Sequence, residues 1–422
     1  MNTAIQLSLL APLLALTPAG SGDGWSQEEL EATTARIQTQ VEAIRGQEFE
    51  RPVGVRLTDA EGFLGYARQR MKAMSREDAM AREGDIAHLL GLAPTDLDME
   101  EAVLELLKGQ VGGFYDPGTD TFYLMEAFTG GVAKVILAHE LTHALDDQLY
   151  DLDDDFKRLV EDRDGSAAYQ SVVEGSGTIA MSQWMMKHGA ELTQAELMEA
   201  ASMGTEELGN APAVLWKPLL ASYTQGQAFL EAGFKLRRKQ GATMTDVIAA
   251  AFAAPPTTME QVLHPAKYWD PEQRDEPVEV PVEDRLPEGW TVLERGTLGE
   301  LYVALLTEKD RKVDFQNPLS MLTIRYTNDG ARGWDGDTLV LRGKGEARWL
   351  TLAIAWDSPE DAVEFVKAIA PRLEVIERAL GQLDPGEVGR GVRLRTLAVG
   401  DAQPLTVLEV WAGADLDEHV GG

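Results

Sequence analysis

The chain contains no cysteine, few histidines and few basic residues. Its 422 residues include six His, and 38 Lys and Arg stand against 70 Asp and Glu. The lack of cysteine excludes disulfides, thiolate metal sites and cysteine nucleophiles, so any metal must be held by His, Asp or Glu. The net charge of −32 repels phosphate backbones and anionic lipid headgroups, which argues against nucleic-acid binding.

Long apolar runs are also scarce, and the one at the start is short. It extends from Ile5 to Leu16, whereas a helix needs roughly 20 apolar residues to span a bilayer. The run has the length of a signal-peptide core, and Thr17-Pro18-Ala19 is an acceptable cleavage site. We predict a signal peptide over residues 1–19, although no Lys or Arg precedes the run. An uncleaved anchor and a helix packed on the body are the alternatives. Cleavage would leave a secreted or periplasmic protein without stable membrane insertion.

The amino-acid composition changes at residues 271–287, which are rich in proline and charged residues. We interpret this segment as a linker between two domains. Helical periodicity dominates residues 25–270, and GGFYDPGTDTFYLM predicts a hairpin whose returning strand is Thr121 to Met125. Residues 288–422 alternate between helical and strand patterns, which predicts a smaller α+β domain. The predicted fold class is therefore α+β.

The motif HELTH, at residues 139–143, carries the clearest chemistry. Positions i and i+4 share one face of a helix, so His139 and His143 can direct two imidazoles to one point. Zn²⁺ accepts imidazole nitrogen at about 2.0–2.1 Å, and a catalytic site leaves one position to water. Glu140, beside the first histidine, can take a proton from that water and return it to a leaving amine. The alternative is a pair of histidines on a helix surface.

A third protein ligand has to come from elsewhere in the chain. No histidine follows at the spacing HExxHxxGxxH, because Asp146, Asp147 and Gln148 occupy that stretch. The segment AYQSVVEGSGTIAM offers Glu174 on a helical face of mostly small residues, which lets another helix approach closely. Glu161 is nearer in sequence but stands in a polar, turn-like region. We predict Glu174 as the third ligand, the alternative being a charged residue on a solvated face.

The segments HELTHALDDQ, VVEGSGT, SYTQGQAF and PPTTMEQVLHPAKY occur in this order. Over about residues 50–270 the chain resembles zinc metallopeptidases of the gluzincin type. More narrowly, it resembles a group of largely uncharacterised secreted bacterial HExxH proteins. The resemblance implies a helix-rich zincin-like domain with a small sheet. Its edge strand would line the cleft and pair with an extended substrate, and we expect Thr121 to Met125 to be that strand.

One position departs from the gluzincin pattern. Thermolysin-like members place an aspartate four residues after the third ligand to orient a ligand histidine, and here that position is Thr178. We expect Asp146, Asp147 or Thr178 to take this role instead.

Peptide hydrolysis also profits from a donor to the oxyanion. The candidates are Tyr223 and His264, followed by Tyr268, and each has a structural role as its alternative. The predicted function is a secreted zinc peptidase acting on peptides or proteins. The alternatives are a zinc-binding but non-catalytic surface or scaffold protein, and a latent enzyme whose C-terminal domain covers the cleft. The sequence identifies neither the substrate nor the oligomeric state.

Overall fold

The computed structural model describes residues 24–416 except for 75–77, 195–204, 284–285, 310–312, 316, 318–319, 321–322, 384–388, 398–403 and 415. The predicted signal peptide therefore lies outside the described residues. No helix in the described part has the length and apolar content needed to cross a membrane.

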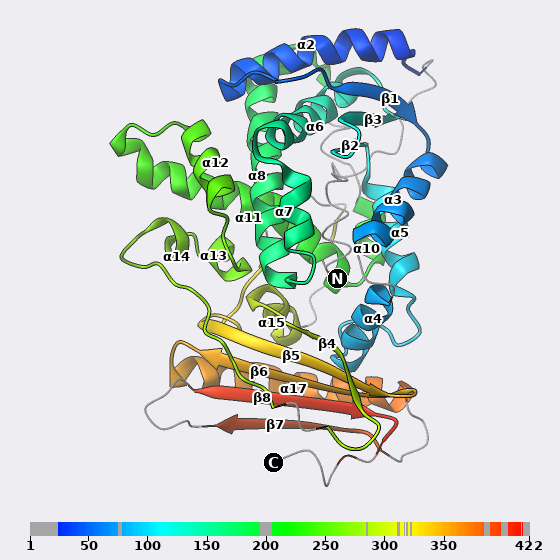
Figure 1. The fold of residues 1–422 in the computed structure, drawn as a ribbon, viewed down its shortest axis with the longest axis vertical. Coiled ribbons are helices and arrows are strands. Elements are labelled where there is room, and N and C mark those ends of the chain that lie inside the picture. The colour runs from blue at the N-terminus through cyan, green and yellow to red at the C-terminus, as the bar shows by residue number, and fades with distance from the viewer. Residues whose placement is uncertain are drawn as a thin grey trace.

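The first part of the chain is built from helices around a small sheet (Figure 1). Up to the motif the elements are α2 (Gln27–Arg45), β1 (Gly54–Thr58), α3 (Ala60–Met74), α4 (Ala79–Leu89), α5 (Met99–Gln110), β2 (Gly113–Asp116) and β3 (Thr121–Met125). The motif helix and those after it are α6 (Gly130–Tyr150), α7 (Leu152–Arg158), α8 (Arg163–His188), η2 (Gly189–Glu191), α10 (Thr205–Asn210), α11 (Ala213–Arg237), η3 (Arg238–Gln240), α12 (Met244–Ala253), α13 (Met259–Leu263) and α14 (Ala266–Trp269).

The small sheet has the strand order β1-β3-β2. The predicted hairpin forms, with β2 antiparallel to β3, but β1 pairs with the other side of β3 in parallel register. The expectation that Thr121–Met125 is an edge strand is therefore wrong. Both of its edges are used, because β1 pairs with it from 67 residues earlier in the chain, and β2 has the outer edge beside α6.

The described residues of the later part of the chain form a five-stranded antiparallel sheet with accompanying helices. Its order is β4-β5-β6-β8-β7, and its elements are β4 (Thr291–Gly296), α15 (Glu300–Thr307), β5 (Trp334–Lys344), β6 (Ala347–Trp356), α17 (Pro359–Leu383), β7 (Gly391–Leu397) and β8 (Leu405–Ala412). Helices and strands alternate here, as the sequence predicts, and α17 continues through Pro371. The two sheets and their helices make the fold α+β.

Two faces of the large sheet are covered by different segments. Side chains alternate along a strand, and Leu352 and Ile354 of β6 join the main core together with Phe365 of α17. Ala353 and Ala355 lie on the opposite face, where Val280 packs against them. The segment predicted as a linker thus lies along this face, and the amide of Val278 donates to Asp335 O at 2.7 Å.

Helix α4 connects the two parts of the molecule. It packs against α17, β6 and β8 of the later part and against α5 of the first part. Asp85 pairs with Arg348 of β6 at 2.5 Å, and Glu83 pairs with Arg163 at the start of α8, also at 2.5 Å. Both residues of the second pair are nearly fully buried, so the junction is a packed interface.

Candidate metal centre

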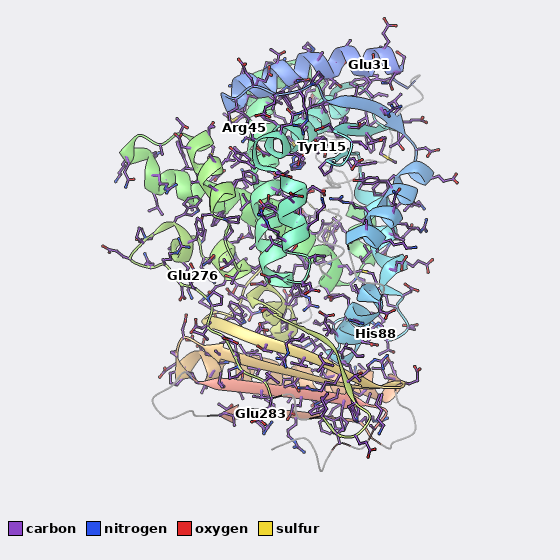
Figure 2. All side chains as sticks on the ribbon, in the orientation of Figure 1. Glu31, Arg45, His88, Tyr115, Glu276 and Glu283 are labelled. Carbon is purple, nitrogen blue, oxygen red and sulfur yellow. The ribbon has the colours of Figure 1, made fainter. Side chains whose placement is uncertain are left out.

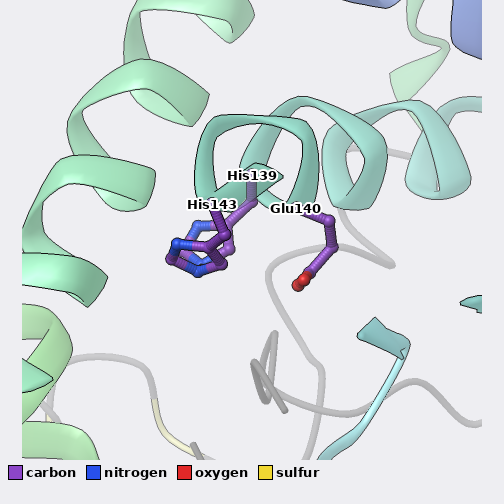
Figure 3. A group of neighbouring side chains, drawn as sticks. All are labelled: His139, Glu140 and His143. Atoms are coloured by element: carbon purple, nitrogen blue, oxygen red, sulfur yellow. The ribbon is translucent and has the colours of Figure 1, made fainter. Parts of the chain in front are cut away.

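The two motif histidines lie on a helix that is buried on all sides. The rings of His139 and His143 are 0% exposed, as is the side chain of Glu140. Apolar residues surround them on α6, including Ile136, Leu137 and Leu141, which explains why this helix shows almost no amphipathic pattern. Figure 3 shows both imidazoles on the same side of α6, with the Glu140 carboxylate beside them.

Glu174 of α8 completes a group of three converging ligand atoms. The Nε2 atoms of His139 and His143 are 2.9 Å apart. Oε2 of Glu174 lies 3.1 Å from Nε2 of His139 and 3.5 Å from Nε2 of His143. Ligands at about 2.0–2.1 Å from a tetrahedral zinc stand roughly 3.3 Å from one another, so this donor set fits the ion. The structure places the three predicted ligands together.

Gly177 has no side chain at the place where the imidazole rings of His139 and His143 lie. A Cβ at this position would lie 2.7 Å from Cε1 of His139 and 2.9 Å from Cε1 of His143. Both distances are shorter than real Cβ contacts allow. The segment following Glu174 therefore needs glycine here, one turn after the ligand, to admit both imidazoles.

The pKa values of Glu174 and His139 are both shifted by their surroundings in the cluster. Burial alone would raise the pKa of Glu174, but the charge of His143 and hydrogen bonds from both histidines outweigh it, so this pKa lies below its usual value. Burial, together with the neighbouring His143, lowers the pKa of His139. The shifts thus favour an ionised Glu174 and a neutral His139, the forms in which these two groups bind a metal.

The pKa of Glu140 is shifted in the opposite direction to that of Glu174. Burial raises its pKa well above the usual value, and the charge of Glu174 raises it further. The backbone N–H of Tyr115, on β2, is close enough to oppose this rise. A raised pKa makes a carboxyl group a stronger proton acceptor, which is what a general base requires.

Tyr223 reaches the cluster from α11. Its ring lies 5.8 Å from the ring of His139, centroid to centroid, in a stacked arrangement. The hydroxyl oxygen is buried and makes no hydrogen bond to the described residues. Burial and the charges of Glu174 and Glu140 raise the pKa of Tyr223 well above 10, so the hydroxyl stays neutral and can donate.

A glycine pair allows α11 to approach this closely. A Cβ at Gly226 would lie 1.9 Å from the backbone O of Ser171 on α8, and one at Gly175 would lie 2.5 Å from the backbone C of Gly226. The backbones of α8 and α11 are thus in direct contact. This contact fixes Tyr223 relative to Glu174.

The other two oxyanion candidates are engaged elsewhere. Nε2 of His264 lies 3.0 Å from Oε1 of the buried Glu300, on α15. The hydroxyl of Tyr268 donates to the backbone O of Ala254. The structure therefore brings Tyr223, and neither His264 nor Tyr268, beside His139 and Glu174.

The expected orienting role of Asp146 or Asp147 is not observed. Asp146 pairs with Arg45 of α2 at 2.7 Å and accepts from Ser176 at 2.6 Å. Asp147 accepts from the Tyr115 hydroxyl at 2.9 Å. Arg45 and Tyr115 lie close to α6 (Figure 2). Each aspartate is bound to a segment distant in sequence, which the motif alone could not indicate.

Thr178 does not take the orienting role either. Its Oγ1, and Nδ1 of both His139 and His143, are buried without a hydrogen-bond partner among the described residues. The site therefore differs from the thermolysin-like arrangement in how its histidines are supported.

Comparison with known proteins adds one family match. Residues 289–404 match a family described as a domain of unknown function, DUF8575. This range covers most of the large sheet and α17 and lies outside the candidate metal centre. No curated protein and no solved structure matches the chain.

Proposed function

We propose that the protein is a secreted or periplasmic zinc metallopeptidase of the gluzincin type. The observation that carries the proposal is the convergence of Nε2 of His139, Nε2 of His143 and Oε2 of Glu174 within 3.5 Å, beside a buried Glu140. A purely structural zinc site needs no additional carboxyl group with a raised pKa at its rim. The intact Glu140 therefore favours catalysis over a scaffold role.

The residues divide the chemistry of peptide hydrolysis among them. His139, His143 and Glu174 would hold Zn²⁺, which polarises a carbonyl and lowers the pKa of water towards about 7. Glu140 accepts a proton from the attacking water and transfers it to the nitrogen of the leaving amine. The neutral hydroxyl of Tyr223 donates a hydrogen bond to the carbonyl oxygen as negative charge develops there.

β2, rather than β3, is the strand whose outer edge could pair with an extended substrate. The amide of Met125 donates to Gly112 O, so the even-numbered residues of this strand face β3. In an antiparallel pair the intervening residues point their backbone groups the other way. Gly113 and Tyr115 therefore direct their N–H and C=O groups away from β3, where both residues are buried and Tyr115 lies next to Glu140. Backbone pairing of this kind recognises peptides with little regard to side chains.

Metal content is the first test of this function. The purified protein should contain about one zinc per chain, and Glu174→Ala should contain much less. Glu140→Gln should keep the zinc and lose hydrolysis of a fluorogenic peptide library. A wild-type protein without zinc after incubation with the ion would refute the metal site. A Glu140→Gln variant with full activity would leave zinc binding intact and refute the mechanism.

A further inference from the structure

Gln170 is the side chain that holds the second oxygen of Glu174. It lies one turn earlier on α8, and its Nε2 donates to Oε1 of Glu174 at 2.6 Å. Both side chains are 0% exposed, so water does not compete for this bond. A hydrogen bond to a charged acceptor in such surroundings is stronger than one between neutral groups.

The two carboxylate oxygens of Glu174 consequently differ in their surroundings. Oε2 faces the two histidine nitrogens, at 3.1 and 3.5 Å. Oε1 faces the amide of Gln170. Free carboxylates bind metals through one oxygen or through both, so an external donor on Oε1 decides between the two modes.

We propose that Gln170 is a positioning residue that restricts Glu174 to one metal–oxygen bond. The inference rests on the proposed zinc site. With Oε1 engaged by Gln170, the carboxylate does not occupy a second coordination position, and that position stays open for water. Oε1 is also withdrawn as an acceptor for the proton of this water. Glu140 is then the carboxylate that receives it.

The amide group suits this role because it is a neutral donor. A lysine or arginine at position 170 would neutralise the charge with which Glu174 attracts the metal. A carboxylate there would repel Glu174. Glutamine donates without changing the charge of the ligand set, and residues at i and i+4 of a helix are spaced for this contact.

The test compares Gln170→Met with the wild type and with Ser171→Ala. Methionine is close to glutamine in length and carries no N–H. Ser171 is the next residue on α8, is equally buried, and bonds to Ala167 O and Met259 Sδ rather than to Glu174. Zinc affinity is measured by competition with a chromogenic chelator, and coordination by the visible spectrum of the Co²⁺-loaded proteins.

We expect Gln170→Met to bind zinc about 10–100-fold more weakly, as is typical when a partner of a metal ligand is removed. Its Co²⁺ bands should lose intensity relative to the tetrahedral wild type, because the released carboxylate adds a second oxygen. Ser171→Ala should match the wild type in both measurements. If Gln170→Met fails to fold, Gln170→Leu, which also lacks an N–H donor and carries no charge, should show the same two changes.

Three results would overturn the inference. Equal affinity and equal spectra in Gln170→Met and the wild type would show that the hydrogen bond does not set the coordination mode. Equal losses in Gln170→Met and Ser171→Ala would show a packing effect only. A wild type that binds neither Zn²⁺ nor Co²⁺ would refute the zinc site itself. This failure is distinguishable from a failure of the Gln170 inference, because it is seen without any variant.

Discussion

Replacing Gly177 with alanine would place a methyl group against both ligand histidines. The new Cβ would lie 2.7 Å from Cε1 and 2.9 Å from Nε2 of His139, whereas ordinary contact begins at 3.4 Å. The ring therefore has to retreat by about 0.7 Å, while zinc–ligand distances vary by only about 0.2 Å. We expect zinc affinity to fall by at least about 100-fold, which corresponds to roughly 2.7 kcal/mol.

The stability of the metal-free protein should change much less. Alanine gains about 0.5–1 kcal/mol over glycine inside a helix, and overpacking costs about 1–3 kcal/mol. Chelator competition and the zinc-dependent rise in Tm separate the two effects. Gly189→Ala, at the end of the same helix, is the control because no atom lies within 4 Å of its added Cβ. Wild-type zinc affinity in Gly177→Ala would refute the assignment of this glycine to the metal site.

Three further predictions concern the surroundings of the site. Tyr223→Phe should keep its zinc and lose about 10²–10³-fold in kcat, since one oxyanion donor is removed. An unchanged kcat would show that Tyr223 is not the oxyanion donor. Gly226→Ala should lower the free energy of unfolding by about 1–3 kcal/mol or more in a urea titration, because its Cβ meets Ser171 O at 1.9 Å; wild-type stability would contradict the close helix contact. Burial raises the pKa of Asp147 to about 6 from 3.8, so this group stabilises the fold fully below pH 3.8 and loses that contribution as pH rises through 6. The stability of the wild type relative to Asp147→Asn should therefore decrease between pH 4 and 6, and a constant difference would contradict the assignment.

The proximity of His139, His143 and Glu174, the three proposed ligands, could be anticipated from local features of the sequence. The i, i+4 spacing places His139 and His143 on one helix face, and the small residues around Glu174 indicate a close helix approach. The supporting contacts depend on segments far apart in sequence. Arg45 pairs with Asp146 across about one hundred residues, and nothing in the motif indicates it. Choosing between Tyr223 and His264 likewise required the packing of α11 and α15.

Strand order in the small sheet illustrates the same limit. The aromatic pattern and the Asp116-Pro117-Gly118 turn predict the β2–β3 hairpin correctly. Whether β3 is central or peripheral depends on β1, which reaches it through a long crossover containing three helices. Hydrophobic alternation gives the pairing partners of a hairpin, but it does not show which edge a distant strand will take.

The segment that contains Val278 and Val280, along the outer face of the large sheet, restricts movement between the two parts of the molecule. Its proline and charge content suggests a flexible hinge, yet Val278 and Val280 are bonded to β5 through the backbone O of Asp335 and the hydroxyl of Thr338. Bending there would expose apolar surface, so the two halves of the molecule cannot swing about this connection at low cost. A gene divided at this segment would yield a C-terminal fragment with an uncovered, aggregation-prone sheet.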